Sequence, residues 1–278
     1  MTTAPLPMPV SHFTDLLATE WLKLRSLRST YWALGVSALV LIAVNANAAR
    51  ADYVNYPHYN NVTRSQFADT ALFDAFTNGA AMILVLTAAS IGAVTVVGEY
   101  STGLIRTTFA AVPDRRSLMS AKAAVVTAVM TVYGAVVASV SFAASQAILS
   151  GRGVGLSISY PGAWRVVVAS ALLAPVSALV GMAMGALVRH SATTMVLATG
   201  LLLLLPIFVT ERYHWTACVR NALPFNAWGR LVQVNYGRVP YRLAERYPTT
   251  VGGAWVVFVV WALVAAVVTV LVVNRRDV

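Results

Sequence analysis

The sequence is poor in charged residues. Asp, Glu, Lys and Arg make up 11% of its 278 residues, whereas 58% are hydrophobic. A soluble domain has about 25% charged residues, which it needs to cover a water-facing surface. The shortage excludes an ordinary soluble globular protein and predicts that most of the surface faces lipid.

Lysine and cysteine are also scarce. The only lysines are Lys23 and Lys122, so the net charge of +10 depends on arginine. Arginines in the loops of membrane proteins contact phospholipid headgroups and help to set topology, and we therefore expect no nucleic-acid partner. The single cysteine, Cys218, excludes an intrachain disulfide and a thiolate metal cluster.

Signatures of nucleotide binding, metal binding and catalysis are absent from the sequence. Neither lysine follows the glycine-rich stretch that a P-loop needs to hold phosphates. His12, His58, His190 and His214 are scattered, without the spacing of a zinc protease. We therefore expect no enzyme and no catalytic, cofactor-binding or metal site in this chain.

What the sequence does contain is a series of long apolar runs, each near the roughly 20 residues that cross about 30 Å of hydrocarbon. They predict an all-α membrane protein in which residues 11–278 form one transmembrane domain after a disordered tail, residues 1–10. The third run exceeds the bilayer core and should tilt or protrude into water. Residues 50–79 and 211–253 are expected to be polar outer loops. The predicted spans are residues 30–49, 80–98, 121–149, 166–188, 192–210 and 254–273.

An amphipathic helix is predicted before the first span, over residues 11–29. At 100° per residue its apolar side chains fall on one arc, which suits a helix lying in the membrane interface. Glu20 and Arg28 interrupt this arc and need a protein partner or a headgroup. No basic residue precedes Lys23, so we expect a retained helix rather than a cleaved signal peptide. The arc consists of Phe13, Leu16, Leu17, Trp21, Leu24, Leu27 and Tyr31.

The spans are expected to contain no ionisable side chain, which argues against a proton-driven carrier. Asn45, Asn47 and Gln146 are the strongest polar groups near span ends, and we favour headgroup contact over a role in lining a pathway. Gly181 and Gly185 form a small-x-x-x-small pattern, which predicts close packing between helices.

The most informative segment joins the second and third spans and reads GEYSTGLIRTTFAAVPDRR over residues 98–116. Glu99 places a carboxylate where the second span ends, and Ser101 or Thr102 can cap a short helix. Asp114 can cap the helix of the third span. A short helix held by two long ones can transmit a push, although an ordinary capped loop explains the pattern equally well.

Together with four other segments, this one resembles the permease subunits of type 2 ABC exporters, notably those of high-GC bacteria. TEWLKLRSLRSTYW at 19–32 resembles the amphipathic elbow helix of that family, and GEYSTGLIRTT at 98–108 resembles its cytoplasmic turn after the second span. LVRHS at 187–191, LPFNA at 223–227 and RRD at 275–277 resemble later turns and the usual ending.

The resemblance implies a six-helix permease in the plasma membrane, with both termini in the cytoplasm, that dimerises with itself or with a sister chain. It implies a separate cytoplasmic ATPase, which would bind ATP and Mg and dock on the elbow helix and on a coupling helix between spans 2 and 3. Glu99 is expected to pair with a basic residue of the ATPase or of the elbow helix, for instance Arg28. The residues expected to couple to the ATPase are Glu20, Arg28, Glu99, Tyr100, Ser101, Thr102, Gly103 and Arg106.

Two other functions remain open on the sequence. One is a stand-alone secondary transporter or channel, which the charge-free spans disfavour. The other is a membrane scaffold that recruits a soluble partner, whose turnover would then not depend on a permeating substrate.

Overall fold

The computed structural model describes residues 12–103, 114–210, 213–234 and 247–275. Within these ranges the chain is helical and contains no β-strand. Six segments of the described chain are long and apolar enough to cross a membrane, which confirms the predicted number of spans and a multi-pass membrane protein. The predicted tail, residues 1–10, lies outside the described residues.

The helices extend along the chain as follows. They are α1 (Phe13–Ser26), α2 (Arg28–Asn55), the 3-10 helix η1 (Tyr56–His58), α3 (Asn61–Ser65), α4 (Phe67–Asp74), α5 (Asn78–Ser101), α7 (Arg115–Ser150), α8 (Ala163–Val188), α9 (Ser191–Thr199), the π-helix η2 (Gly200–Leu204), α10 (Leu205–Phe208), α11 (His214–Asn221), α12 (Pro224–Val232) and α13 (Val251–Arg275).

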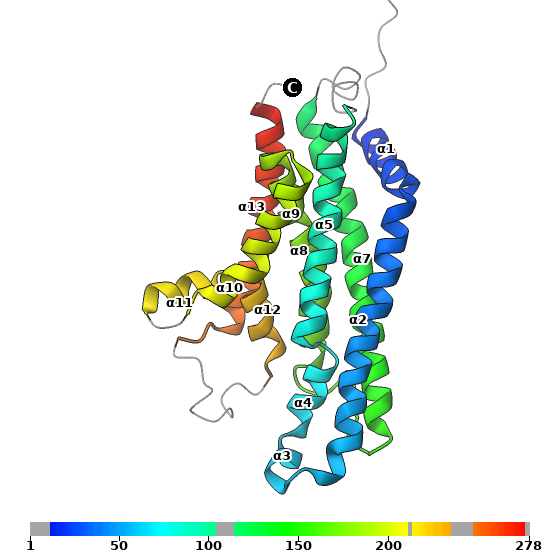
Figure 1. Ribbon diagram of the computed structural model, residues 1–278, viewed down its shortest axis with the longest axis vertical. Helices are drawn as coiled ribbons and strands as arrows, with labels where there is room; N and C mark the ends of the chain where they lie inside the picture. Colours follow the sequence, from blue (N-terminus) through cyan, green and yellow to red (C-terminus); the bar gives the residue numbers. More distant parts are fainter. Residues whose placement is uncertain (1–11, 104–113, 211–212, 235–246, 276–278) are drawn as a thin grey trace, which may run out of the picture.

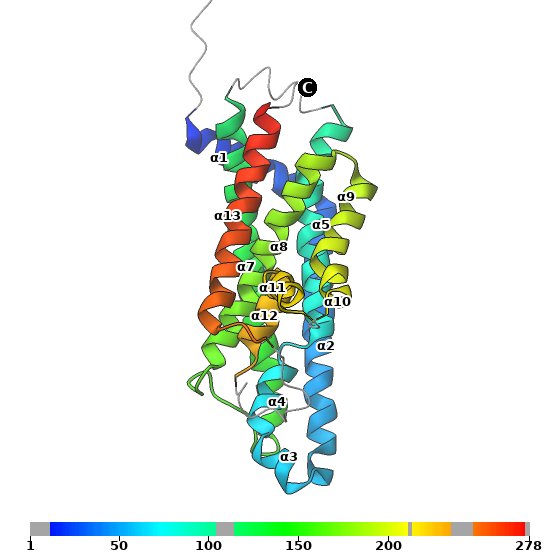
Figure 2. The ribbon, with the colours of Figure 1, turned by 90° about the vertical axis from the view of Figure 1, so that its left-hand side faces the viewer.

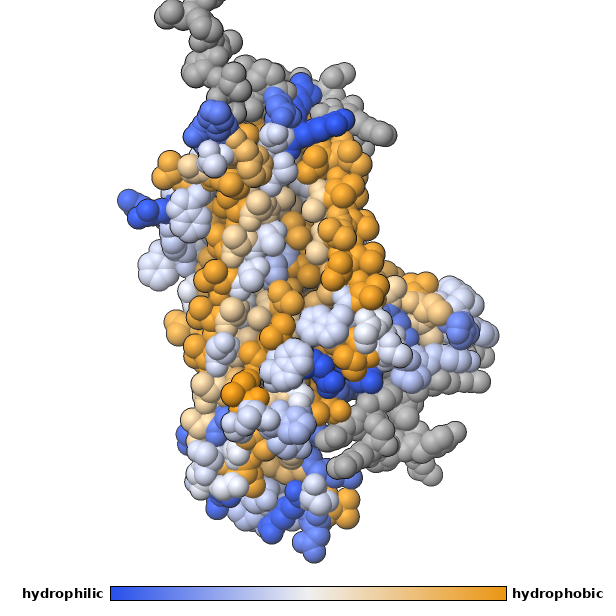
Figure 3. Space-filling view, turned by 180° about the vertical axis from the view of Figure 1, so that it is seen from behind, coloured by the Kyte–Doolittle hydropathy of each residue, from blue (hydrophilic) through white to orange (hydrophobic). Residues whose placement is uncertain are grey.

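The long helices α2, α5, α7, α8 and α13 run along the long axis of the molecule (Figures 1 and 2). α8 lies in the middle, where it packs against α5, α7, α9, α12 and α13. It is apolar around most of its circumference, as expected of a buried helix. On the face shown in Figure 3, apolar side chains cover much of the middle of the molecule, and hydrophilic ones lie at its two ends and beside the lobe that projects from the bundle.

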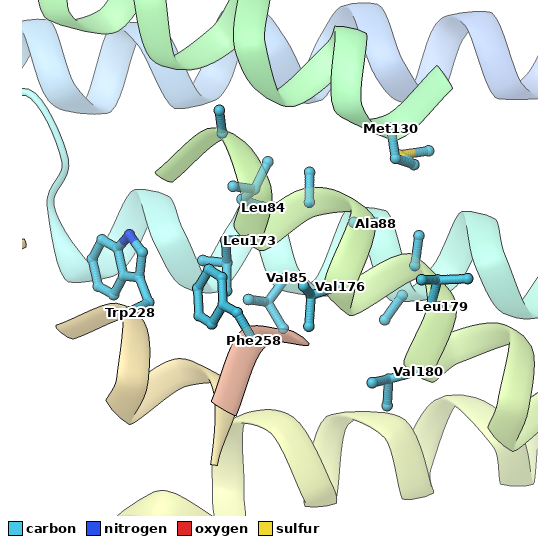
Figure 4. Close-up of a cluster of buried hydrophobic side chains, with 14 of the residues drawn as sticks. Leu84, Val85, Ala88, Met130, Leu173, Val176, Leu179, Val180, Trp228 and Phe258 are labelled. Atoms are coloured by element: carbon cyan, nitrogen blue, oxygen red, sulfur yellow. The ribbon is translucent and has the colours of Figure 1, made fainter. Parts of the chain in front are cut away.

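The core consists of small and branched side chains that several helices direct toward α8 (Figure 4). Close packing of this kind is the main attraction between helices in lipid, where the hydrophobic effect gives little preference for helix over acyl chain. The labelled members include Leu84, Val85 and Ala88 from α5, Met130 from α7, Leu173, Val176, Leu179 and Val180 from α8, Trp228 from α12 and Phe258 from α13.

Several helices extend beyond the predicted spans. α2 continues to Asn55, and α7 has 36 residues, which corresponds to about 54 Å of helix. Asp114 begins α7 as its N-cap and accepts hydrogen bonds from the backbone N–H groups of Arg116 and Ser117, which confirms the predicted cap. The sequence marks where the apolar run ends, whereas a helix continues for as long as its backbone hydrogen bonds are made.

The expectation of a polar loop at residues 50–79 is wrong. This stretch contains the end of α2 followed by η1, α3 and α4. Phe67 is buried against the ring of Tyr56, at 4.9 Å between ring centroids. Gln146 of α7 donates a hydrogen bond to the carbonyl of Ala71, which fixes α4 to the bundle. Short helices with these long-range contacts form a cap on the end opposite to α1 (Figure 1).

The preference for headgroup contacts at Asn45 and Gln146 is also wrong, because both side chains are buried. Asn45 accepts from the backbone N–H and hydroxyl of Thr77, the N-cap of α5, and its amide donates to Ser141 of α7. These bonds join three helices. They also satisfy the buried polar groups, which would cost free energy if they had no hydrogen-bond partner. Asn47 is exposed.

The expected loop at residues 211–253 contains α11 and α12, so this expectation is wrong as well. Trp228 of α12 is buried, and its indole N–H donates to Ser170 of α8 at 3.0 Å. Trp261 of α13 donates to the carbonyl of Ala222 at 2.6 Å. Figure 2 shows α11 and α12 beside the middle of the bundle rather than beyond its end.

Pro206 lies near the end of the fifth span, which ends at Phe208. The span consists of α9, the π-helix η2 and α10, and Pro206 stands in the first turn of α10. Proline has no N–H and its ring displaces the carbonyl four residues earlier, so a wider π-turn just before it accommodates the disruption.

Candidate functional site

Figure 1 shows that α1 lies at the same end of the bundle as the end of α13. Charged side chains of α1, α5 and α7 meet at this end. α1 ends at Ser26, and the extended backbone of Leu27 separates it from α2. α1 packs against α7. Together α1, α5 and α7 form a junction that contains four ionised groups. We call these the charged quartet: Glu20, Lys23, Glu99 and Lys122.

The charged quartet forms a closed ring of alternating signs. Lys23 Nζ lies 2.7 Å from Glu20 Oε1 and 3.0 Å from Glu99 Oε1. Lys122 Nζ lies 2.8 Å from the same Glu99 oxygen and pairs with Glu20 Oε2. Each charge therefore has two partners of opposite sign, and both carboxylates bridge α1 or α5 to α7.

Burial makes this arrangement necessary. The side chains of Glu20 and Lys122 are 3% and 4% exposed, and that of Glu99 is 10% exposed. An ionised group out of water loses several kcal/mol of hydration, which only close partners offset. Glu20 thus finds a protein partner for the charge that interrupts the apolar arc of α1.

Lys23 is the accessible member of the quartet, with 37% of its side chain exposed. Burial is the largest single influence and lowers the pKa of Lys23, but the hydrogen bonds and charges of Glu20 and Glu99 together outweigh it. The pKa of Lys23 is therefore raised above its usual 10.5, and the side chain stays protonated at neutral pH.

Glu99 has one further acceptor. Its Oε1 atom accepts hydrogen bonds from both lysines, while Oε2 is buried and has no hydrogen-bond partner among the described residues. Such an oxygen is a site for one more donor, because a buried acceptor left unpaired costs about 1–3 kcal/mol.

Glu99 does pair with a basic residue of α1, as expected, but this residue is Lys23 and not Arg28, the example chosen from sequence. The partners of Glu99 are Lys23 and Lys122, whereas Arg28 begins α2 as an exposed residue. The expectation that the spans contain no ionisable residue is wrong, because Lys122 lies inside α7 and Glu99 inside α5, both buried. The signals that would have identified this site are the i, i+3 spacing of Glu20 and Lys23 and the second lysine next to an apolar run.

Tyr100 and Arg189 connect two further segments at this end. Arg189 ends α8 with φ +60°, a left-handed conformation that is costly for a residue with a Cβ. Its guanidinium carbon lies 4.6 Å from the centroid of the Tyr100 ring, in the range of a cation–π contact. This contact holds the turn between α8 and α9 against the end of α5.

The residues after Tyr100 end α5. The hydroxyls of Ser101 and Thr102 both donate to the carbonyl of Gly98, and Gly103 follows with φ +72°. In this structure the two hydroxyls therefore stabilise the C-terminal end of α5, the helix that precedes them. Arg106 and the predicted short helix belong to residues 104–113, which lie outside the described residues.

Gly181 and Gly185 face α5 from α8. A Cβ on Gly181 would lie 2.0 Å from the carbonyl oxygen of Ala89, and one on Gly185 would lie 3.1 Å from that of Ala93. Gly92 of α5 approaches α8 in the same way. The two helices are thus in backbone contact over several turns, in the manner of small-residue packing in membranes.

Comparison with known proteins adds no family assignment. No protein-family model matches the chain, and no curated protein matches it. Over the described ranges, no three His, Cys, Asp or Glu side chains lie together as metal ligands. The residues that meet at the charged junction contact one another through charge and packing.

Proposed function

We propose that this chain is the membrane-spanning permease subunit of an ATP-binding-cassette exporter, driven by a separate cytoplasmic ATPase. The observation that supports the proposal is the meeting of three family-like segments at one end of the bundle. Residues 19–32 and 98–103 meet in the charged quartet, and residues 187–191 join them through Arg189 and Tyr100.

The charged quartet provides a route for motion from such a partner. A push on the segment that follows Gly103 acts directly on the end of α5. Glu99 passes the displacement to α1 through Lys23 and to α7 through Lys122. Because both lysines share one carboxylate oxygen, Glu99 can keep one partner while it releases the other. α7 then carries the displacement along its whole length.

The proposal includes the orientation and the assembly. The chain lies in the plasma membrane with both termini in the cytoplasm. The basic residues near the span ends favour this orientation. ATP and Mg bind to the partner chain, and the permease dimerises with a second copy or a sister chain. α1 is then the elbow helix.

Affinity purification of the full chain in mild detergent tests the proposal. We expect an ATPase of about 25–35 kDa, the size of one or two ordinary domains, to co-purify in a fixed ratio. The absence of any nucleotide-hydrolysing partner, after crosslinking in intact membranes as well as in detergent, would exclude an exporter.

Substitution of Glu99 tests the proposed route. In the reconstituted complex, Glu99→Lys and the isosteric Glu99→Gln should reduce transport-coupled ATPase activity about fivefold or more, the lower end of typical coupling free energies. Asp69→Asn removes a carboxylate at the opposite end and serves as the control. If Glu99→Lys fails to insert, Glu99→Gln still decides the matter, and normal coupling in that variant counts against the route.

A proton- or ion-coupled secondary transporter is the second candidate, and the charged quartet itself favours it. Ionisable residues buried in membrane helices often belong to proton relays. The purified chain would then move solute in liposomes under a pH gradient without ATP, and Lys122→Met would abolish that movement. An exporter subunit alone shows no such movement.

A further inference from the structure

A cavity of about 430 Å³ lies between α1, α5 and α7, next to the charged quartet. This volume falls within the roughly 300–1,000 Å³ typical of ligand pockets. Most of its wall is apolar, and the charged groups are confined to one part of it. The apolar wall consists of Leu24, Leu27, Val94, Val125 and Val126.

The cavity opens toward lipid rather than toward the bundle interior. Val94 belongs to its wall and is nevertheless 46% exposed. It lies two turns before the end of α5, within a helix long and apolar enough to span the membrane. A molecule in the cavity is thus in reach of the surrounding bilayer, where acyl chains are the most abundant apolar group.

The exposed charge at the cavity wall is positive. Glu20 and Glu99 also belong to the wall, but both are buried and bind the lysines, and Oε2 of Glu99 is buried without a partner among the described residues. Lys23 is 37% exposed in its side chain. Ser26 and Thr102, which also belong to the wall, are exposed at the ends of α1 and α5. One end of the cavity therefore offers a cation and hydroxyl groups, and the remainder offers hydrocarbon.

We propose that this cavity binds an anionic phospholipid, with one acyl chain along Val94 and Val125 and the phosphate beside Lys23. Basic pockets between helices at the headgroup level suit anionic lipids, because an ammonium held near phosphate adds to the apolar attraction. The bound lipid fills the space between α1 and the two helices α5 and α7. This site requires only that the chain lies in a membrane, so it does not depend on the exporter proposal.

The test uses the full chain, purified in detergent and depleted of lipid. Phosphatidylglycerol and phosphatidylcholine with identical acyl chains are added, and bound lipid is counted by native mass spectrometry while melting temperature is recorded. We expect phosphatidylglycerol to bind at least tenfold more tightly and to raise the melting temperature more. The preference should shrink between 0.1 and 1 M salt, where the screening length falls from about 10 to 3 Å.

Two matched substitutions locate the site. Val94→Trp fills the cavity and should abolish the gain from phosphatidylglycerol, whereas Val132→Trp, on the exposed face of α7 at 64% exposure, should leave it unchanged. Thr95→Leu is the milder cavity-filling variant if Val94→Trp does not fold. Equal binding of both lipids, an equal loss in the Val132 variant, or full competition by inorganic phosphate would overturn the proposal.

Discussion

Two contacts of α5 differ in almost every physical respect. Along its middle, α5 meets α8 through glycines and alanines whose backbones touch, without a charge between them. At its end, α5 meets α1 and α7 through the charged quartet. The first contact depends on shape over many atoms and has no alternative arrangement. The second depends on a few charges that can exchange partners, and so it suits a joint that moves.

The difference shows how a membrane protein can combine a rigid part with a movable one. Packing in lipid is short-ranged, so a separation of even 1 Å between α5 and α8 loses much of the attraction. Charge interactions decay more slowly and strengthen in a low-dielectric environment. On the proposed route, the quartet would stretch or exchange partners while α5 and α8 stay packed together.

The largest effect is expected at the packed contact. Gly181→Val would place a Cβ 2.0 Å from the carbonyl oxygen of Ala89, which forces the two helices apart. We expect a loss of about 4–5 kcal/mol, enough to remove most folded protein. Gly35→Val is the control, because a Cβ there meets nothing within 4 Å. Size-exclusion chromatography of both variants in detergent measures the outcome, and equal profiles would show that the contact is not rigid.

A smaller but still large effect is expected at the quartet. Lys122→Met leaves two buried carboxylates with Lys23 alone, and breaking a buried pair in this way typically costs about 3–5 kcal/mol. Glu20→Leu combined with Lys122→Met leaves the pair of Lys23 and Glu99 in place. The free energy of unfolding that the double variant loses should therefore be about 1–3 kcal/mol smaller than the sum of the losses in the two single variants. Chemical unfolding in detergent measures this coupling, and strictly additive losses would contradict the ring of charges.

The smallest effect concerns pH. Because the pKa of Lys23 is raised by folding, its contribution to stability is fully present below its usual value of 10.5 and is lost as pH rises through the higher folded value. The effect is modest because solvent screens this half-exposed side chain. Above about pH 10.5, the melting temperature of the wild type should therefore fall more steeply than that of Lys23→Arg, whose guanidinium does not titrate. Parallel curves would mean that Lys23 is not coupled to folding.

The local elements were predicted best where the residues of the element itself determine its structure. The six spans follow from the apolar runs, and Asp114 follows from the preference of helix starts for a short acidic side chain. The short helices α4, α11 and α12 were missed, because contacts from distant helices stabilise them. Trp228 and Ser170, 58 positions apart, are one such contact.

The candidate site was predicted in part for the same reason. Glu20 and Glu99 were selected from sequence, each as the charge that interrupts or ends an apolar stretch. Their partner Lys122 was overlooked, because a lysine next to an apolar run indicates a buried charge but not which carboxylates it meets. The pair of Glu20 and Lys122 joins residues 102 positions apart.

The sequence by itself determined that six segments are long and apolar enough to cross a membrane and where helices can approach closely, because composition and spacing govern hydration and local sterics. Only the tertiary structure decided which charges meet. A buried charge is tolerated wherever an opposite one reaches it, and that depends on how α1, α5 and α7 pack, not on any order along the chain.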